Sequence, residues 1–177
     1  MKRFNAVLAM TFLTAFTISN GVHAADAQRQ GEVAARGADV MPFNLNDTTH
    51  IFIKTQRGGI QRVIAKKPSD TRQIALVREH LRAIQTQFGN GDFSAPTQIH
   101  GPEMPGLAEL KAARPGQIEI RYRDVEAGAE LTYRTEDKTL VSALHRWFDA
   151  QLADHGADAM AGDDMMRHHH GAHMAHM

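Results

Sequence analysis

The pattern of hydrophobic and polar positions predicts a β-hairpin followed by a helix in the first half of the chain. Residues 49–54 and 60–65 are rich in β-branched and aromatic side chains, and Arg57-Gly58-Gly59 between them is typical of a turn. The next apolar residues recur at spacings of three and four, as on the buried face of a helix that Ser69 or Asp70 can cap. They are Ile74, Val77, Leu81, Ile84 and Phe88.

The same order of elements recurs in the second half. Residues 117–122 alternate as a half-buried strand, residues 130–134 return the chain, and a second stripe predicts a helix that Thr135 or Asp137 can cap. This stripe consists of Val141, Leu144, Phe148 and Leu152. The two halves align at an offset of 67 residues, so we predict an α+β domain over residues 47–157. It would contain two ββα units that form a four-stranded antiparallel sheet with both helices on one face.

A long connection, residues 89–116, separates the two units and contains four prolines. Connections of this length inside a compact domain usually contain structure of their own or carry function. Residues 105–113 can form a short helix with a proline in its first turn. His100, Glu103 and Met104 place an imidazole, a carboxylate and a thioether within five residues. Either these residues belong to a site, or the segment is a proline-stiffened loop whose Met104 packs on the sheet.

The amino terminus has the organisation of a secretory signal. Lys2 and Arg3 precede an apolar run from residue 6 to residue 18, and Val22-His23-Ala24 offers small residues where a signal peptidase cleaves. A run of about thirteen residues is too short to cross a bilayer as a helix. We therefore predict a cleaved signal peptide, residues 1–24, that exports the protein to the periplasm; an uncleaved membrane anchor is the alternative. Residues 25–46 are small and polar without periodicity, which predicts a linker.

Composition narrows the classes of partner and of chemistry. Without residues 1–24, the chain has 153 residues, of which 18 are basic and 20 are acidic. This balance predicts no nucleic-acid partner and no stable membrane insertion after signal cleavage. The sequence contains no cysteine, which excludes disulfides, thiolate metal sites and thiol nucleophiles. A metal site must therefore use histidine, methionine, carboxylate or backbone ligands.

The carboxy-terminal residues 160–177 combine five methionines with five histidines. Imidazole nitrogen and thioether sulfur are neutral ligands that soft and borderline transition metals prefer, copper above all. We expect residues 158–177 to be a disordered metal-binding tail for copper, or alternatively for nickel or zinc. The predicted ligands are Met165, Met166, His168, His169, His170, His173, Met174, His176 and Met177. A hexahistidine tag would be an unbroken run of histidines, whereas these histidines are interspersed with methionine, alanine and glycine. The alternative is a solvated tail that binds no physiological metal.

Two further histidines lie beside the apolar stripes of the predicted helices. His80 follows Val77 by three residues and His145 follows Val141 by four, so both imidazoles should lie where a helix meets the sheet. If the helices are neighbours, these two rings could approach His100 and form a zinc or copper site with a carboxylate. The alternative for each is a boundary histidine that hydrogen-bonds a backbone carbonyl.

The sequence lacks the motifs of several enzyme classes. No serine lies in a Gly-x-Ser-x-Gly elbow, and neither of the glycine-rich nucleotide-binding fingerprints occurs. The His-Glu-x-x-His signature of zinc proteases is also absent. An enzymatic function is therefore left open rather than predicted.

Four segments resemble a group of small exported bacterial proteins of unknown function. They are Met41-Pro-Phe-Asn-Leu-Asn-Asp-Thr-Thr-His50, Gly91-Asp-Phe-Ser-Ala-Pro96, Ile99-His-Gly-Pro-Glu-Met-Pro-Gly-Leu107 and Leu144-His-Arg-Trp-Phe-Asp-Ala-Gln151. Members of this group have sometimes carried the label aspartate carbamoyltransferase. This chain does not support that label, because it is much shorter than such a catalytic chain, lacks its Ser-Thr-Arg-Thr phosphate loop and carries an export signal. The resemblance covers residues 41–156 and implies no catalytic residue.

These observations lead to hypotheses of different kinds. The first is a periplasmic metal-binding protein whose tail collects copper for buffering, tolerance or delivery. The second is a small ligand- or protein-binding module with a groove near His100 and an incidental tail. A deep pocket with His80, His100 and His145 at its mouth would favour the second hypothesis. A metal-dependent hydrolase, which needs those three histidines around one ion with an open coordination position, is the third.

Overall fold

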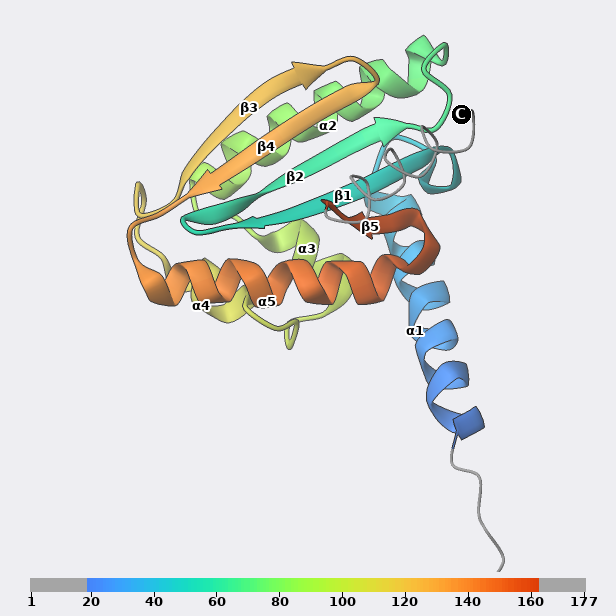
Figure 1. The fold of residues 1–177 in the computed structure, drawn as a ribbon, viewed down its shortest axis with the longest axis horizontal. Coiled ribbons are helices and arrows are strands. Elements are labelled where there is room, and N and C mark those ends of the chain that lie inside the picture. The colour runs from blue at the N-terminus through green and yellow to red at the C-terminus, as the bar shows by residue number, and fades with distance from the viewer. Residues whose placement is uncertain (1–18, 163–177) are drawn as a thin grey trace, which may run out of the picture.

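Five α-helices and a five-stranded sheet make up residues 19–162, the part of the chain that the computed structural model describes (Figure 1). The strands are β1 (Thr48–Thr55), β2 (Gly58–Ala65), β3 (Glu119–Val125), β4 (Gly128–Arg134) and β5 (Ala159–Ala161). The helices are α1 (Ser19–Val40), α2 (Thr71–Gly89), α3 (Ser94–His100), α4 (Leu107–Ala112) and α5 (Lys138–His155). Two short 3-10 helices, Leu45–Asp47 and Gly156–Asp158, precede β1 and β5. The nine predicted tail ligands and most of the predicted signal peptide lie outside the described residues.

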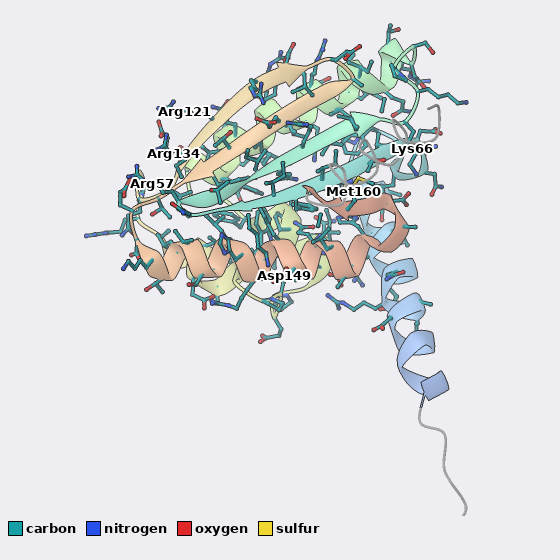
Figure 2. The ribbon with its side chains drawn as sticks, viewed as in Figure 1. Arg57, Lys66, Arg121, Arg134, Asp149 and Met160 are labelled. Carbon is teal, nitrogen blue, oxygen red and sulfur yellow. The ribbon has the colours of Figure 1, made fainter. Side chains whose placement is uncertain are left out.

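The sheet is mixed, which corrects the prediction of a four-stranded antiparallel sheet. Its strand order is β3-β4-β2-β1-β5, and β5 pairs in parallel with β1, so that His50 lies opposite Ala159. The other pairs are antiparallel. The sequence did not reveal β5 because three residues are too few to show an alternating pattern. Met160, labelled in Figure 2, belongs to this edge strand and therefore to the folded domain.

Both predicted ββα units are present, and the predicted stripe of α2 is confirmed as part of the core. Of the predicted stripe of α5, Leu144 and Phe148 are buried and Leu152 is partly buried against the core, whereas Val141 lies outside the buried face. The side chain of Asp70 accepts a hydrogen bond from the Gln73 amide at the start of α2, and Asp137 caps α5 in the same way. Figure 1 shows α2 behind β3 and β4, and α5 alongside β1 and β5. Side chains of β1, β2 and β4 that point toward these helices, such as Phe52, Val63 and Leu131, are at most 2% exposed.

The hairpin between β1 and β2 needs both of its glycines. Gly58 has a φ of +138°, a conformation that favours glycine. A Cβ on Gly59 would collide with the ring of Phe148 and lie 2.8 Å from the carbonyl oxygen of Ile53. The Gly-Gly pair, which the sequence predicted as part of a turn, therefore also allows α5 to pack directly on the hairpin.

Most of the segment predicted as a linker, residues 25–46, is helical. Helix α1 contacts α5 and α3, although few of its side chains are apolar and buried. Polar contacts hold it instead: Arg29 pairs with Asp154, and the Arg36 guanidinium donates to the carbonyl oxygen of Ile99 at 2.6 Å. A helix attached through polar contacts shows no hydrophobic periodicity, so the sequence pattern did not predict it. Within residues 19–162, no helix is both long and apolar enough to cross a membrane.

The connection between the two units contains two short helices. Helix α4 confirms the predicted helix near residues 105–113, and Met104 is buried as the packing alternative proposed. Helix α3 was not predicted; its Pro96 lies in the first turn, where a proline costs no backbone hydrogen bond. Because α3 ends at His100, it directs this imidazole into the interior, where the side chain is 4% exposed.

Candidate functional site

Four histidines from four elements line one buried cavity between the sheet and the helices. They are His50 on β1, His80 on α2, His100 at the end of α3 and His155 at the end of α5. The cavity volume open to the centres of water-sized molecules is about 40 Å³. This is space for roughly three waters or one small ligand. Among the described residues that line it, the remainder are apolar or carry amides, and none is Asp, Glu, Lys or Arg.

His50 and His155 form the centre of this cluster. The alternation of β1 turns His50 toward the helices, and the residue is 3% exposed. His155 occupies the last position of α5, four residues after Gln151, whose side-chain oxygen accepts from His155 Nε2 at 3.1 Å. The two rings lie with their centres 4.7 Å apart and their planes 6° from parallel. The His100 ring meets that of His155 at 5.3 Å and nearly at a right angle.

A buried carboxylate orients His100. His100 Nδ1 lies 2.8 Å from Oδ2 of Asp154, and Arg29 Nη2 donates to the same oxygen at 2.7 Å. Burial alone would raise the pKa of Asp154, but hydrogen bonds from His100 and Arg29 lower it below its ordinary value. The carboxylate is therefore ionised at neutral pH and accepts the Nδ1 proton of His100.

The hydrogen bonds assign a tautomer to each of these three rings. His100 donates Nδ1–H to Asp154, which leaves a lone pair on Nε2. His155 donates Nε2–H to Gln151, which leaves a lone pair on Nδ1. His50 hydrogen-bonds the backbone of Asp158, while its own Nδ1 is buried without a partner. In each neutral ring, one nitrogen is held by the protein and the other is free to accept.

The environment keeps several of these imidazoles uncharged. Burial lowers the pKa of His50 well below its ordinary value, and the neighbouring imidazoles lower it further. Burial lowers the pKa of His80 to about 4 and is also the largest cause of the fall to about 4 at His155. At neutral pH these groups are therefore hydrogen-bond acceptors or metal ligands rather than cations.

Two buried polar atoms in the described part of the chain lack a hydrogen-bond partner, and both belong to residues that line this cavity. They are His50 Nδ1, an acceptor, and Trp147 Nε1, a donor. A buried polar group without a partner costs about 1–3 kcal/mol. Water molecules or a small ligand in the cavity would satisfy both atoms.

The structure brings together only part of the predicted histidine set. His80 and His100 line the same cavity, whereas His145 lies at the β1–β2 turn and donates Nε2–H toward the carbonyl oxygens of Thr55 and Gly58 at 3.0 and 2.9 Å. The possible convergence of all three histidines does not occur, and the boundary-histidine alternative is confirmed for His145. The hydrolase hypothesis built on that trio loses its geometric basis.

Sequence reasoning did not assign a role to His50 or His155, although both positions carried a signal. His50 is two residues before Phe52 in a strand whose alternate side chains point inward. His155 follows Phe148 by seven residues and Gln151 by four, which places it on the buried face of α5. The missing information was that the ends of β1, α3 and α5 meet, since this contact joins segments far apart in the sequence.

No metal-ready arrangement is present within residues 19–162: no three His, Asp or Glu side chains there are already placed around one point. The predicted ligands from Met165 to Met177 lie outside this range. Comparisons with protein-family models, curated proteins and solved structures found no significant match. The resemblance to small exported bacterial proteins therefore stays a prediction.

Proposed function

We propose that this protein binds transition-metal ions in the periplasm, copper above all, for buffering, tolerance or delivery. The observation in the fold that supports the proposal is the gathering of four imidazoles around one buried cavity, three of them with a pKa below the ordinary value. Only neutral imidazole can ligate a metal, so such an environment favours metal binding over protonation. The nine histidines and methionines of residues 165–177 add a second supply of neutral ligands.

The two kinds of donor in residues 165–177 suit both oxidation states of copper. Thioether sulfur and imidazole would share Cu(I), and imidazole would dominate for Cu(II). Nickel and zinc would use the same imidazoles, with the carboxylates of Asp163 and Asp164 as further ligands. A set of many interchangeable ligands favours capture and release over catalysis.

A copper titration of the mature protein tests this proposal. The comparison is a tail-substituted variant of full length, in which the histidines and methionines of residues 165–177 become glutamine and leucine. Substitution is preferable to deletion from residue 160, because Met160 and Ala161 belong to β5. We expect the variant to lose most of its bound Cu(I) equivalents, measured with a chromophoric chelator. Unchanged stoichiometry and affinity would show that the tail does not bind copper.

A second candidate function is the binding of a small neutral organic molecule in the cavity. The observation that favours it is the unpaired indole donor of Trp147, which a metal ion cannot satisfy, in a lining without charged side chains. The chain has a single tryptophan, so one indole N–H resonance reports on the cavity. If the candidate holds, neutral fragments with a hydrogen-bond acceptor shift this resonance in a fragment screen. A resonance that no fragment moves would leave only the metal proposal.

A further inference from the structure

The geometry points to a metal site inside the domain, in which His50 Nδ1, His100 Nε2 and His155 Nδ1 bind one copper or zinc ion. This site deepens the proposed function and uses no residue of the carboxy-terminal segment. Its ligands come from β1, α3 and α5, so it exists only when the domain is folded.

The first argument is the set of hydrogen bonds behind the three rings. Metal-ligating histidines usually donate their other N–H to a carboxylate, a carbonyl oxygen or a similar acceptor, which fixes the ring and its tautomer. Here His100 donates to Asp154, His155 donates to the Gln151 amide oxygen and His50 bonds the backbone of Asp158. Each ring thus has one nitrogen that is held and one that keeps a lone pair.

The second argument is the spacing of the rings. With a metal–nitrogen distance of about 2.0–2.1 Å, two imidazoles on one tetrahedral ion have ring centres roughly 5 Å apart. The centres of His50 and His155 are separated by 4.7 Å, and those of His100 and His155 by 5.3 Å. His155 is therefore near enough to His50 and to His100 to share an ion with either ring, and it links the other two.

One ring must turn before the ion can bind. The planes of His50 and His155 are 6° from parallel, so their lone pairs run side by side instead of converging, in keeping with the lack of a ready-made ligand group in residues 19–162. The χ2 torsion of histidine is broad, and its rotation is inexpensive. Losing one hydrogen bond, such as that between His155 and Gln151, costs little free energy. A structural zinc site contributes far more free energy than one hydrogen bond, so coordination outweighs the rearrangement.

A buried carboxylate next to the proposed site can balance the charge of the ion. The ionised Asp154 lies behind His100 and balances part of the charge of a divalent ion through the imidazole. His100 and Asp154 also line a surface groove of about 500 Å³, which includes Arg29 and Met104. A water molecule can take the fourth position.

Co(II) absorption of the full-length tail-substituted protein tests the site, because the d–d bands of Co(II) report its coordination. We expect one Co(II) per chain with intense bands typical of four-coordination, displaced by one equivalent of Zn(II). The substitutions His50→Phe, His100→Phe and His155→Phe should each reduce Co(II) affinity at least tenfold. The matched control, His145→Gln, removes an imidazole outside the cavity and should leave binding unchanged.

A second measurement needs no substitution in the cavity and so does not depend on variants that fail to fold. In ¹⁵N-histidine spectra of the tail-substituted protein, Zn(II) should shift the lone-pair nitrogens of three rings, including Nδ1 of His50. A tail-substituted protein that binds no Co(II), or whose binding survives all three substitutions, overturns this inference. If that protein loses all metal while the unsubstituted chain binds copper, the tail proposal stands alone; if both bind equally, only the internal site stands.

Discussion

Single buried side chains give the cavity its chemical character, and His80 shows this in its simplest form. Its ring packs edge-on against Phe43 at 5.4 Å, and burial is the cause that lowers its pKa to about 4. Because no charge partner is needed for this shift, His80 should titrate far below an exposed histidine. The consequence is a dependence of folding stability on pH.

We predict that the free energy of unfolding falls as the pH drops from 6.5 toward 4. The unfolded chain, with a histidine pKa of about 6.5, then binds a proton that folded His80 does not. At pH 5 the loss attributable to His80 is about 2 kcal/mol. Urea unfolding at pH 7.5 and pH 5 measures it, and the His80→Leu variant should lose less stability over this interval. An equal loss in both proteins would contradict the assigned pKa.

Glu130 is the buried charge on the opposite face of the sheet. Its side chain is 2% exposed and accepts from Arg62 Nη2 at 2.6 Å and from Arg123 Nε at 2.6 Å. Burial would raise the pKa of Glu130, but the hydrogen bonds from the two guanidinium groups lower it below the ordinary value. An acid held between two arginines across β2, β3 and β4 ties the two hairpins together.

Removing this carboxylate should destabilise the protein strongly. Glu130→Ala leaves two guanidinium groups without their partner, and we expect a loss of about 2–4 kcal/mol in the free energy of unfolding at pH 7. The control is Glu119→Ala in β3, whose ion pair with Arg121 is exposed on both sides and should contribute less than about 1 kcal/mol. Urea denaturation of both variants decides the matter; similar losses would mean that burial does not strengthen the Glu130 pairs.

Whole helices were predictable from the sequence where their buried face is a long stripe of apolar residues. The stripes that contain Val77 and Leu144 gave α2 and α5 because each repeats over several turns. Helix α1 has no such apolar stripe, because arginine and glutamine side chains attach it to α3 and α5. Strand β5 shows no alternating pattern because it is only three residues long. Polar attachment and short pairing are properties of the tertiary structure, which periodicity does not encode.

Among the polar side chains that attach helix α1, Arg29 makes contacts with two other helices. Arg29 binds Asp154 and also donates to the carbonyl oxygen of His100 at 3.2 Å, so it joins α1 to both α5 and α3. We predict that Arg29→Ala accelerates amide hydrogen exchange across residues 26–40 at least tenfold. The control Gln28→Ala removes only an exposed bond to Glu32 within the same helix and should leave exchange unchanged. Equal exchange in the two variants would show that α1 is held by other contacts.

Only part of the candidate site could be predicted from the sequence, because the cavity histidines are brought together by the fold of the whole molecule. Local composition was sufficient to predict ligands in residues 165–177, because their donors are neighbours in the chain, and this prediction lies outside the described residues. The cavity histidines are separated by up to 105 positions, from His50 to His155, and meet only through the fold. The sequence placed His80 beside its stripe but could not show that His100 and His155 would reach the same cavity.

This difference between a local and a fold-dependent ligand set has a thermodynamic consequence. If the proposed ligands in residues 165–177 bind ions as neighbours in the chain, that binding does not require a folded domain and should not favour the native state. Ligands contributed by His50, His100 and His155 are brought together only by folding, so an ion bound there stabilises the native state by about 2.7 kcal/mol at 100 times its dissociation constant.

We therefore predict that Zn(II) raises the melting temperature by about 5–10 °C, since each kcal/mol corresponds to about 2–4 °C in a protein of this size. The increase should be the same in the unsubstituted and the tail-substituted protein, and absent in the His50→Phe variant. Differential scanning calorimetry at fixed protein concentration measures all three. An increase that requires the tail residues would mean that they bind the ion together with the domain. No increase in any of the proteins would mean that the cavity holds no ion.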